Sequence, residues 1–373
     1  MQHFHRQRLY RHYLQAFLSS SKCQVLEGVI KFRWKLLPSE QREGIRSYLV
    51  QKVITISQDE RSLRAESSLV NKLNLTLVQV LKHEWPQNWP SFIGDIVGSS
   101  RTSEVLCENN VVILRLLSEE VFDFSKDSMT AAKAEALRHS LSAEFCQIFE
   151  LFNFILQAST RPSLVCKTLQ ALQRYITWIP DQYVFETRLL ETLCVKFFPV
   201  ATFRIDTLMV LTEVAGLSRS AYSRVFEQLY ISVLSQLVRF LPPDTTLRKV
   251  WRDLPPTEQT FIRHLALFFT TFFTSHVDLL EGEAYRSVLL AGLNYLVAIS
   301  DLDDPEIFKI CLEFWLHLSN DLYTLDCSYT STVLSAPPGL LVSNDPVTGR
   351  SSSQMHPRKA VYAEVLSRVR EVM

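Results

Sequence analysis

The chain has 373 residues, of which 47% are hydrophobic, and its 39 basic residues are balanced by 39 acidic ones. This length exceeds one ordinary core, so several domains or an array of repeats are expected. The zero net charge argues against a dedicated nucleic-acid binder, whose surface would be strongly basic. Only nine glycines occur, which disfavours strand-rich folds and the glycine loops that cradle phosphates.

The first predicted segment covers residues 1–21 and is locally basic, with Arg6, Arg8 and Arg11. A solvated end explains this charge better than an arm that binds nucleic acid. The segment lacks the apolar core of a secretory signal. No run of 18 apolar residues follows anywhere in the chain, so no membrane span is expected.

From about residue 22 onward the hydrophobic period is that of a helix. Five stripes carry this pattern: Leu114, Leu117, Val121 and Phe124; Phe145, Phe149, Phe152 and Leu156; Leu189, Leu193 and Phe197; Ile262, Leu265, Phe269, Phe272 and Phe273; Ile307, Cys311, Phe314 and Leu318. Strict alternation is absent over more than a few residues. We therefore predict an all-α protein without a sheet.

The same helical runs repeat along the chain. A Leu followed three residues later by an aliphatic residue recurs with a mean spacing of about 45 residues, close to the ~40–47 residues of HEAT repeats. One antiparallel helix pair cannot bury its own apolar face, but stacked pairs can. This predicts an α-solenoid of HEAT-type antiparallel helix pairs that forms a superhelical arch.

A corner is predicted at Trp85, Pro86, Trp89 and Pro90, between two apolar helical runs. Tryptophan is common both at protein interfaces and in the core where two helices meet. A residue before proline is held extended, which suits a tight turn between helices. We interpret the four residues as a structural corner.

Two further signals mark helix ends. Asp304 precedes Pro305 and Glu306, a favourable helix start because Asp caps free amides and Pro fits the first turn. Gly216 follows an apolar run and is predicted to be a left-handed cap.

Residues 325–357 are rich in Ser, Thr and Pro and are predicted to be a flexible insertion. A helix is expected to resume over 358–373, where the chain stops without a cap. We expect the chain to be truncated there, because solenoids end in a polar capping repeat.

The search for catalytic motifs finds none, so no enzyme, metal or cofactor is predicted. The seven cysteines lack metal-binding or C-x-x-C spacing and are interpreted as free thiols in a reducing compartment. His83 and Glu84 are too few to hold zinc. Asp301, Asp303, Asp304 and Glu306 are better explained as helix caps than as a calcium loop.

The stripe of Lys31, Arg33 and Lys35 lies beside the apolar run of Leu26, Val29 and Ile30. A cationic stripe of this kind fits a concave binding surface as well as a solvated face. The residues alone leave both interpretations open.

Several long segments carry a resemblance: LEGVIKFRWKLLP (26–38), LVQVLKHEWPQNWPSFIGDIVGSSRTSE (77–104), ILRLLSEEVFDFS (113–125), TLQALQRYITWIP (168–180), FRIDTLMVLTEVAGL (203–217) and EIFKICLEFWLHL (306–318). In this order they resemble the amino-terminal portion of the exportin-1 family of karyopherin nuclear export receptors. The resemblance covers about residues 22–323, with a weaker match at 357–373.

The resemblance implies a domain organisation and a partner. Residues 22–125 would be amino-terminal exportin repeats, similar to those of importin-β, and 126–324 further HEAT repeats. The amino-terminal repeats of the family grip the small GTPase Ran in its GTP form. Positions that match their inner helices are Arg33, Trp34, Lys82, Glu84, Glu119 and Glu120, which are therefore the predicted Ran contacts.

The resemblance also limits the expectation. Residues 1–21 do not resemble the first repeat of the family, and the groove for leucine-rich export signals lies beyond the matched part. Cargo is thus expected only through a full-length receptor, with nucleoporins as further partners, and with shuttling between nucleus and cytoplasm and presence at the nuclear envelope. No nucleic acid or membrane insertion is expected. The alternative is a HEAT-repeat scaffold of another assembly, without dependence on Ran.

Overall fold

The computed structural model describes residues 20–122, 131–335 and 357–372, and the side chains of 26–121, 132–325 and 358–372. Throughout these ranges the regular structure is helical and no strand occurs, which confirms the all-α prediction. The chain divides into two compact units, Met1–Tyr183 and Val184–Met373. None of the described helices is both long enough and apolar enough to cross a membrane.

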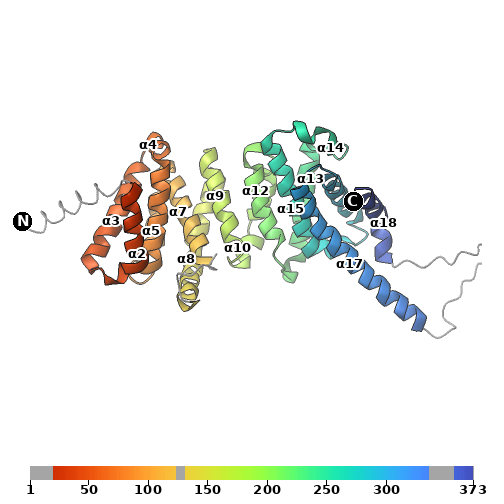
Figure 1. Cartoon of the computed structure of the whole chain (residues 1–373), viewed down its shortest axis with the longest axis horizontal. Coiled ribbons are helices and arrows are strands. Elements are labelled where there is room, and N and C mark those ends of the chain that lie inside the picture. The colour runs from red at the N-terminus through yellow and green to blue at the C-terminus, as the bar shows by residue number, and fades with distance from the viewer. Residues whose placement is uncertain (1–19, 123–130, 336–356, 373) are drawn as a thin grey trace, which may run out of the picture. The chain divides into compact units, whose positions relative to one another are not determined.

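Unit 1 holds the helices coloured from red to yellow-green in Figure 1. Their bounds are α2 (Ser20–Arg33), the 3-10 helix η2 (Trp34–Leu36), α3 (Ser39–Ile56), α4 (Glu60–Ala65), α5 (Ser67–Glu84), α6 (Phe92–Ser100), α7 (Glu104–Phe122), α8 (Ala131–Ala158) and α9 (Pro162–Tyr175). The short α10 (Asp181–Phe185) spans the boundary between the units.

The helices of unit 1 stack in two layers. In one layer α5 packs on α2, α7 on α5, and α9 on α7, while in the other α8 packs on α6; α3 packs against α5. The side chains between the layers come from the predicted stripes: Leu114, Leu117, Phe145 and Phe152 are all at most 1% exposed. This stacking of successive pairs is the arrangement predicted for HEAT repeats.

The predicted corner joins α5 to α6. Trp85 is buried in the core at 1% exposure, and its peptide bond to Pro86 is cis. Trp89 is half-buried and its indole Nε1 donates a hydrogen bond to Asp95 Oδ2 at 3.3 Å. The Arg46 guanidinium of α3 lies 5.0 Å from the Trp89 ring. The two tryptophans therefore bind α3, α5 and α6 together.

Unit 2 contains helices coloured from green to dark blue in Figure 1. They are α11 (Leu189–Thr192), the π-helix η3 (Leu193–Phe197), α12 (Ala201–Ala215), the 3-10 helix η4 (Ser220–Tyr222), α13 (Ser223–Phe240), α14 (Leu247–Val250), the 3-10 helix η5 (Trp251–Asp253), α15 (Pro256–Leu280), α16 (Arg286–Ser300), α17 (Pro305–Ser335) and α18 (Pro357–Val372).

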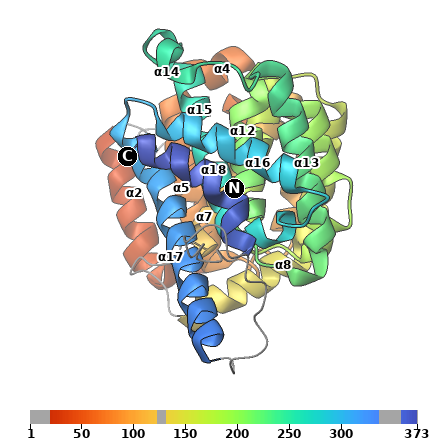
Figure 2. The same cartoon turned by 90° about the vertical axis from the view of Figure 1, so that its right-hand side faces the viewer.

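Unit 2 repeats the two-layer stacking. Helices α12, α15 and α17 pack side by side in one layer, and α13, α16 and α18 in the other. Figure 2 shows α18 crossing in front of this stack. The core along α15 is aromatic, with Phe268, Phe269, Phe272 and Phe273 all fully buried. Stacked pairs of helices are thus present in both units. The predicted superhelical arch depends on how these pairs follow one another over the whole chain, and it stays a prediction.

Two helix ends test the predicted caps. Asp304 caps α17 as predicted, because its Oδ1 accepts hydrogen bonds from the amides of Glu306 (2.9 Å) and Ile307 (3.1 Å). The prediction for Gly216 is wrong: its φ of −76° and ψ of −10° are right-handed. The Gly216 amide still bonds the Thr212 carbonyl, so the helical turn closes without a left-handed residue.

The predicted insertion over 325–357 begins too early. Helix α17 continues to Ser335, so the first third of that segment is helical. Ser and Thr side chains in this stretch do not exclude a helix, since their cost is small beside that of Pro, and the first Pro of the segment comes at 337. Residues 336–356 lie outside the described part, as does most of the predicted segment 1–21.

Candidate functional site

Glu84 is the centre of a buried polar cluster at the end of α5. Its Oε1 accepts a hydrogen bond from Trp34 Nε1 at 2.7 Å and one from Arg42 Nη1 at 3.1 Å. The carboxylate side chain is only 7% exposed. A buried charge needs such compensation, because desolvation without a partner costs several kcal/mol. Two predicted contacts, Trp34 and Glu84, therefore contact each other.

Lys82 and Glu120 form a second pair, which joins α5 to α7. The Lys82 ammonium lies 2.7 Å from Glu120 Oε2, and the lysine side chain is 5% exposed while the glutamate is 33% exposed. The lysine is thus inside the stack, and the glutamate lies at its border.

Glu119 joins α7 to α9. Its Oε1 lies 3.1 Å from Arg174 Nε and 3.7 Å from Arg115 Nε. These three side chains remain about one quarter to one half exposed, so a partner in solution can reach them.

These groups lie on η2, α3, α5, α7 and α9, and we call them together the polar row: Trp34, Arg42, Lys82, Glu84, Glu119, Glu120 and Arg174. Five of the six predicted contacts belong to it. The row holds neighbouring helices at a fixed register through charge-assisted hydrogen bonds. Its solvent border offers carboxylates and guanidinium groups to a protein surface.

His83 lies next to Trp34 of the polar row, in a surrounding that is positively charged. Its ring stacks on Trp34 with centroids 6.4 Å apart. Burial, the largest cause, and the nearby charges of Lys133, Lys35 and Lys82 together lower the pKa of His83 to about 4. Burial also lowers the pKa of Lys133, again with Lys35 and Lys82 contributing. The imidazole is therefore neutral at physiological pH.

Arg33, the sixth predicted contact, lies apart from the row. Its side chain is exposed at the end of α2, next to exposed Lys31 and Lys35. All three side chains of the stripe are exposed, which fits both interpretations that the sequence left open.

Several residues of the site were not found from the sequence. Arg42, Arg174 and Lys133 come from α3, α9 and α8 and reach the site only through packing. Arg42 is 42 positions from Glu84. The only sequence signal is a charge close to a helix end, which many residues share.

Among the described residues, we looked for reactive thiols and for groups of side chains that could bind a metal. Burial raises the pKa of Cys107 and Cys311 to about 11 and that of Cys194 to about 12, so these thiols are protonated at neutral pH. No group of three or more His, Cys, Asp or Glu side chains that could hold a metal occurs among the described residues.

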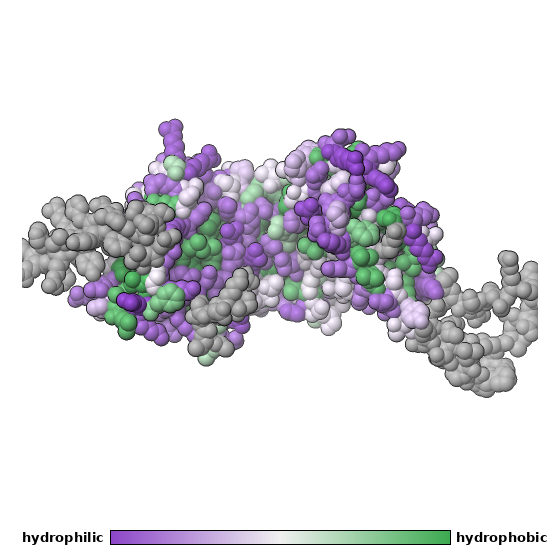
Figure 3. Space-filling model, in the orientation of Figure 1, coloured by the Kyte–Doolittle hydropathy of each residue, from purple (hydrophilic) through white to green (hydrophobic). Residues whose placement is uncertain are grey.

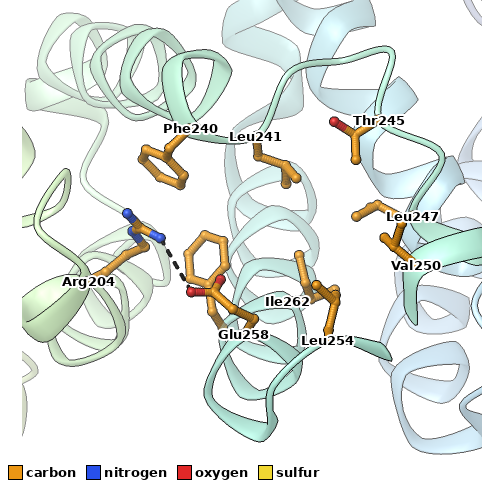
Figure 4. Close-up of a pocket in the computed structure, with 10 residues that line it drawn as sticks. Arg204, Phe240, Leu241, Thr245, Leu247, Val250, Leu254, Glu258 and Ile262 are labelled. Carbon is orange, nitrogen blue, oxygen red and sulfur yellow. Dashed lines mark ion pairs between the residues drawn. The ribbon is translucent and has the colours of Figure 1, made fainter. Parts of the chain in front are cut away.

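A small cavity lies in unit 2 between α12, α13 and α15 (Figure 4). Its volume is about 80 Å³, well below the ~300–1,000 Å³ of small-molecule pockets. Arg204 lies at one end, 3.9 Å from Glu258, and its guanidinium covers the Phe240 ring at 3.8 Å. The arginine is held by an acid and an aromatic ring, so this cavity is a feature of packing.

Comparison of the chain with known proteins finds similarity to exportins. A family model described as "Exportin 1-like protein" matches residues 66–211, and one described as "Chromosome region maintenance or exportin repeat" matches 287–323. Protein EXPORTIN 1A of Arabidopsis thaliana is 44% identical over 353 residues, which are 94% of this chain and 33% of the relative. The chain is homologous to the exportin-1 proteins.

Other exportins agree with this assignment. Exportin-1 of Drosophila melanogaster is 42% identical over 350 residues, which are 94% of this chain and 32% of the relative. Exportin-5 of Homo sapiens is 24% identical over 191 residues, covering 46% of this chain and 16% of the relative. The chain spans about a third of the length of the exportin-1 relatives. Lys82, Glu84, Glu119 and Glu120 lie within the exportin 1-like match.

Proposed function

We propose that this chain acts as part of a nuclear export receptor, and that unit 1 binds the small GTPase Ran in its GTP form. The observation that carries the proposal is the homology to exportin-1 proteins at 42–44% identity over 94% of the chain. The predicted contacts are Arg33, Trp34, Lys82, Glu84, Glu119 and Glu120. No catalytic step is part of this role.

Under this proposal the six residues have two different roles. Trp34, Lys82 and Glu84 are buried and position their neighbours through hydrogen bonds. Arg33, Glu119 and Glu120 reach solvent and would touch the partner. A preformed surface loses less side-chain entropy on binding, so rigid support beneath exposed charges favours affinity.

Export requires that binding responds to the nucleotide state. In the proposed mechanism Ran·GTP and cargo favour the same conformation of the full receptor, so each raises the affinity for the other. Hydrolysis of GTP then releases both. Leucine-rich cargo would bind through the full-length receptor, and nucleoporins would contact it during passage.

The decisive experiment is a pull-down of the purified chain with Ran loaded with a non-hydrolysable GTP analogue, against Ran·GDP. We expect selective capture of the GTP form. Arg33→Glu should weaken this capture about tenfold without lowering thermal stability, since a charge reversal opposes a complementary surface. The matched control is Arg101→Glu, also exposed but on the C-terminal side of α6.

Failure to capture either form, with helical content intact, would contradict the proposal for this chain. Equal capture of both forms would favour the alternative of a HEAT scaffold without Ran dependence. A fluorescent fusion should shuttle between nucleus and cytoplasm and collect at the nuclear envelope. Retention in one compartment would oppose the receptor role.

A further inference from the structure

The end of α2 and the following η2 turn present two large apolar side chains to solvent. Phe32 is 77% exposed and Leu36 is 80% exposed, and they lie four positions apart. Figure 3 shows hydrophobic residues in green gathered over this end of α2, at the lower left. Other exposed apolar side chains of unit 1, such as Phe154, are single. Neighbouring exposed apolar groups mark an interaction site more often than scattered ones do.

Three cations share this surface. Lys31, Arg33 and Lys35 are exposed, and none forms an ion pair with the described residues. The Lys31 ammonium lies 5.4 Å from the centre of the Phe32 ring. By contrast, the charges of the polar row are compensated inside unit 1. We call Lys31, Phe32, Arg33, Lys35 and Leu36 the α2 edge.

The α2 edge is held rigidly. Trp34 lies in its middle, is 2% exposed, and is fixed by the 2.7 Å hydrogen bond to Glu84. The flanking side chains consequently point outward from an anchored turn. Binding sites on anchored elements are presented at low entropic cost.

We propose that the α2 edge is a docking surface for an acidic amphipathic segment of a partner protein, with apolar side chains on Phe32 and Leu36 and carboxylates on the lysines. Charge distinguishes an acidic partner from the two other candidates, which are residues 1–19 of this chain and a second copy of it. Residues 1–19 of this chain carry Arg6, Arg8 and Arg11, which the edge repels. A second copy in a symmetric dimer would place the same cations face to face.

This surface goes beyond the proposed Ran contact. Only Arg33 belongs to both sets, so the variants leave Arg33 unchanged. Phe32→Ser/Leu36→Ser removes the apolar contact and Lys31→Glu/Lys35→Glu reverses the charge. All four side chains are exposed, so folding should be unaffected.

The test uses fluorescence anisotropy with a labelled helical peptide of about 18 residues that has Leu on one face and Glu beside it. A peptide with Lys in place of Glu is the comparator. We expect the full chain to bind the acidic peptide at least tenfold more tightly than the basic one, and less tightly as salt rises. Each double variant should lose at least tenfold in affinity.

The controls are Phe154→Ser for the apolar pair and Arg61→Glu/Arg101→Glu for the charges, all exposed in unit 1. Their affinities should equal that of the unmodified chain. Equal binding of both peptides, unchanged binding by the edge variants, or equal loss in the controls would overturn the proposal. A dimer that dissociates on Phe32→Ser/Leu36→Ser would assign the edge to a second copy, and tenfold weaker capture of Ran·GTP by that variant would assign it to Ran.

Discussion

Gly292 shows how strictly a single residue is constrained in the core of unit 2. A Cβ atom at this position would lie 1.9 Å from the Tyr230 hydroxyl and 3.2 Å from the Phe273 ring. Tyr230 is itself fixed, since its hydroxyl donates to the Val288 carbonyl at 3.1 Å. The glycine is thus required by the close approach of α13 to α16, although its backbone is helical.

We predict that Gly292→Ala destabilises the protein by about 1–3 kcal/mol, because the tyrosine must shift within a packed core. A thermal melt followed by circular dichroism measures the loss. Gly94→Ala is the matched control, because its Cβ would meet only the Gln147 side chain at 3.8 Å. This control should be neutral or stabilising by up to ~1 kcal/mol, as for glycine in other helices. Equal melting of both variants would contradict the steric account.

His83 makes stability depend on pH. Its pKa is about 4 in the folded protein, against 6.5 for an ordinary histidine, chiefly because of burial. The unfolded chain therefore binds more protons between pH 6.5 and 4, and stability falls as pH falls through that window. Because the ring is only half-buried, we expect a contribution of about 1–2 kcal/mol.

Urea unfolding at pH 7 and pH 5 tests this prediction in the unmodified chain and in His83→Gln. The variant should lose less stability on acidification, since Gln does not titrate. The lowered pKa values of His264 and His276 act in both proteins and so cancel in the comparison. An identical loss in both would show that His83 does not contribute.

At the scale of single elements, one arginine of α18 joins this helix to three carboxylates of its neighbours. Arg358 pairs with Asp278 of α15 (2.9 Å), with Glu281 directly after α15 (2.6 Å) and with Asp321 of α17 (2.5 Å). The Tyr362 hydroxyl also donates to Glu281 at 2.5 Å. Beyond this cluster, α18 buries Tyr362, Val365 and Val369. Charge pairing and apolar packing thus hold the same helix.

We expect Arg358→Met to weaken the docking of α18 by about 1–2 kcal/mol, because three carboxylates lose a shared partner. Hydrogen exchange should show faster exchange of amides in 357–372 while α12 stays protected. Arg370→Met, exposed on the same helix, is the control. Unchanged protection of α18 in Arg358→Met would mean that apolar packing alone holds it.

At the scale of the whole molecule, the chain is built from two units of stacked pairs, and each repeat is stabilised by its neighbours. Local damage should therefore spread along a stack and fade with distance. Leu114 is fully buried on α7, a helix that packs on both α5 and α9.

Leu114→Asp tests this behaviour, because it places an unpaired charge on an inter-repeat face. We expect a loss of at least 3 kcal/mol, in the range of severe core substitutions, and loss of hydrogen-exchange protection in α5, α7 and α9. Protection in α15 and α16 of unit 2 should persist. Val112→Asp, at a half-buried position on the same helix, should cost less. A melt unchanged by Leu114→Asp would refute the assigned helix face.

The sequence by itself determined the fold class and the buried stripes. The 3.6-residue period of Phe145, Phe149 and Phe152 is local and defines which helix face is apolar. Proline and acidic caps such as Asp304 are local too, which is why the start of α17 was predictable. The homology was also visible in the sequence, because long segments keep their order.

Only the tertiary structure decided which side chains meet. Trp34 bonds Glu84 across 50 positions, and Lys82 pairs with Glu120 across 38. Such pairs depend on how the helices stack, and no local rule encodes that register. The predicted contacts thus divided into the buried Trp34, Lys82 and Glu84, the part-exposed Glu119 and Glu120, and the exposed Arg33. At Gly216 the backbone stays right-handed and its amide bonds the Thr212 carbonyl, so the glycine closes the turn without the left-handed conformation that the sequence pattern predicted.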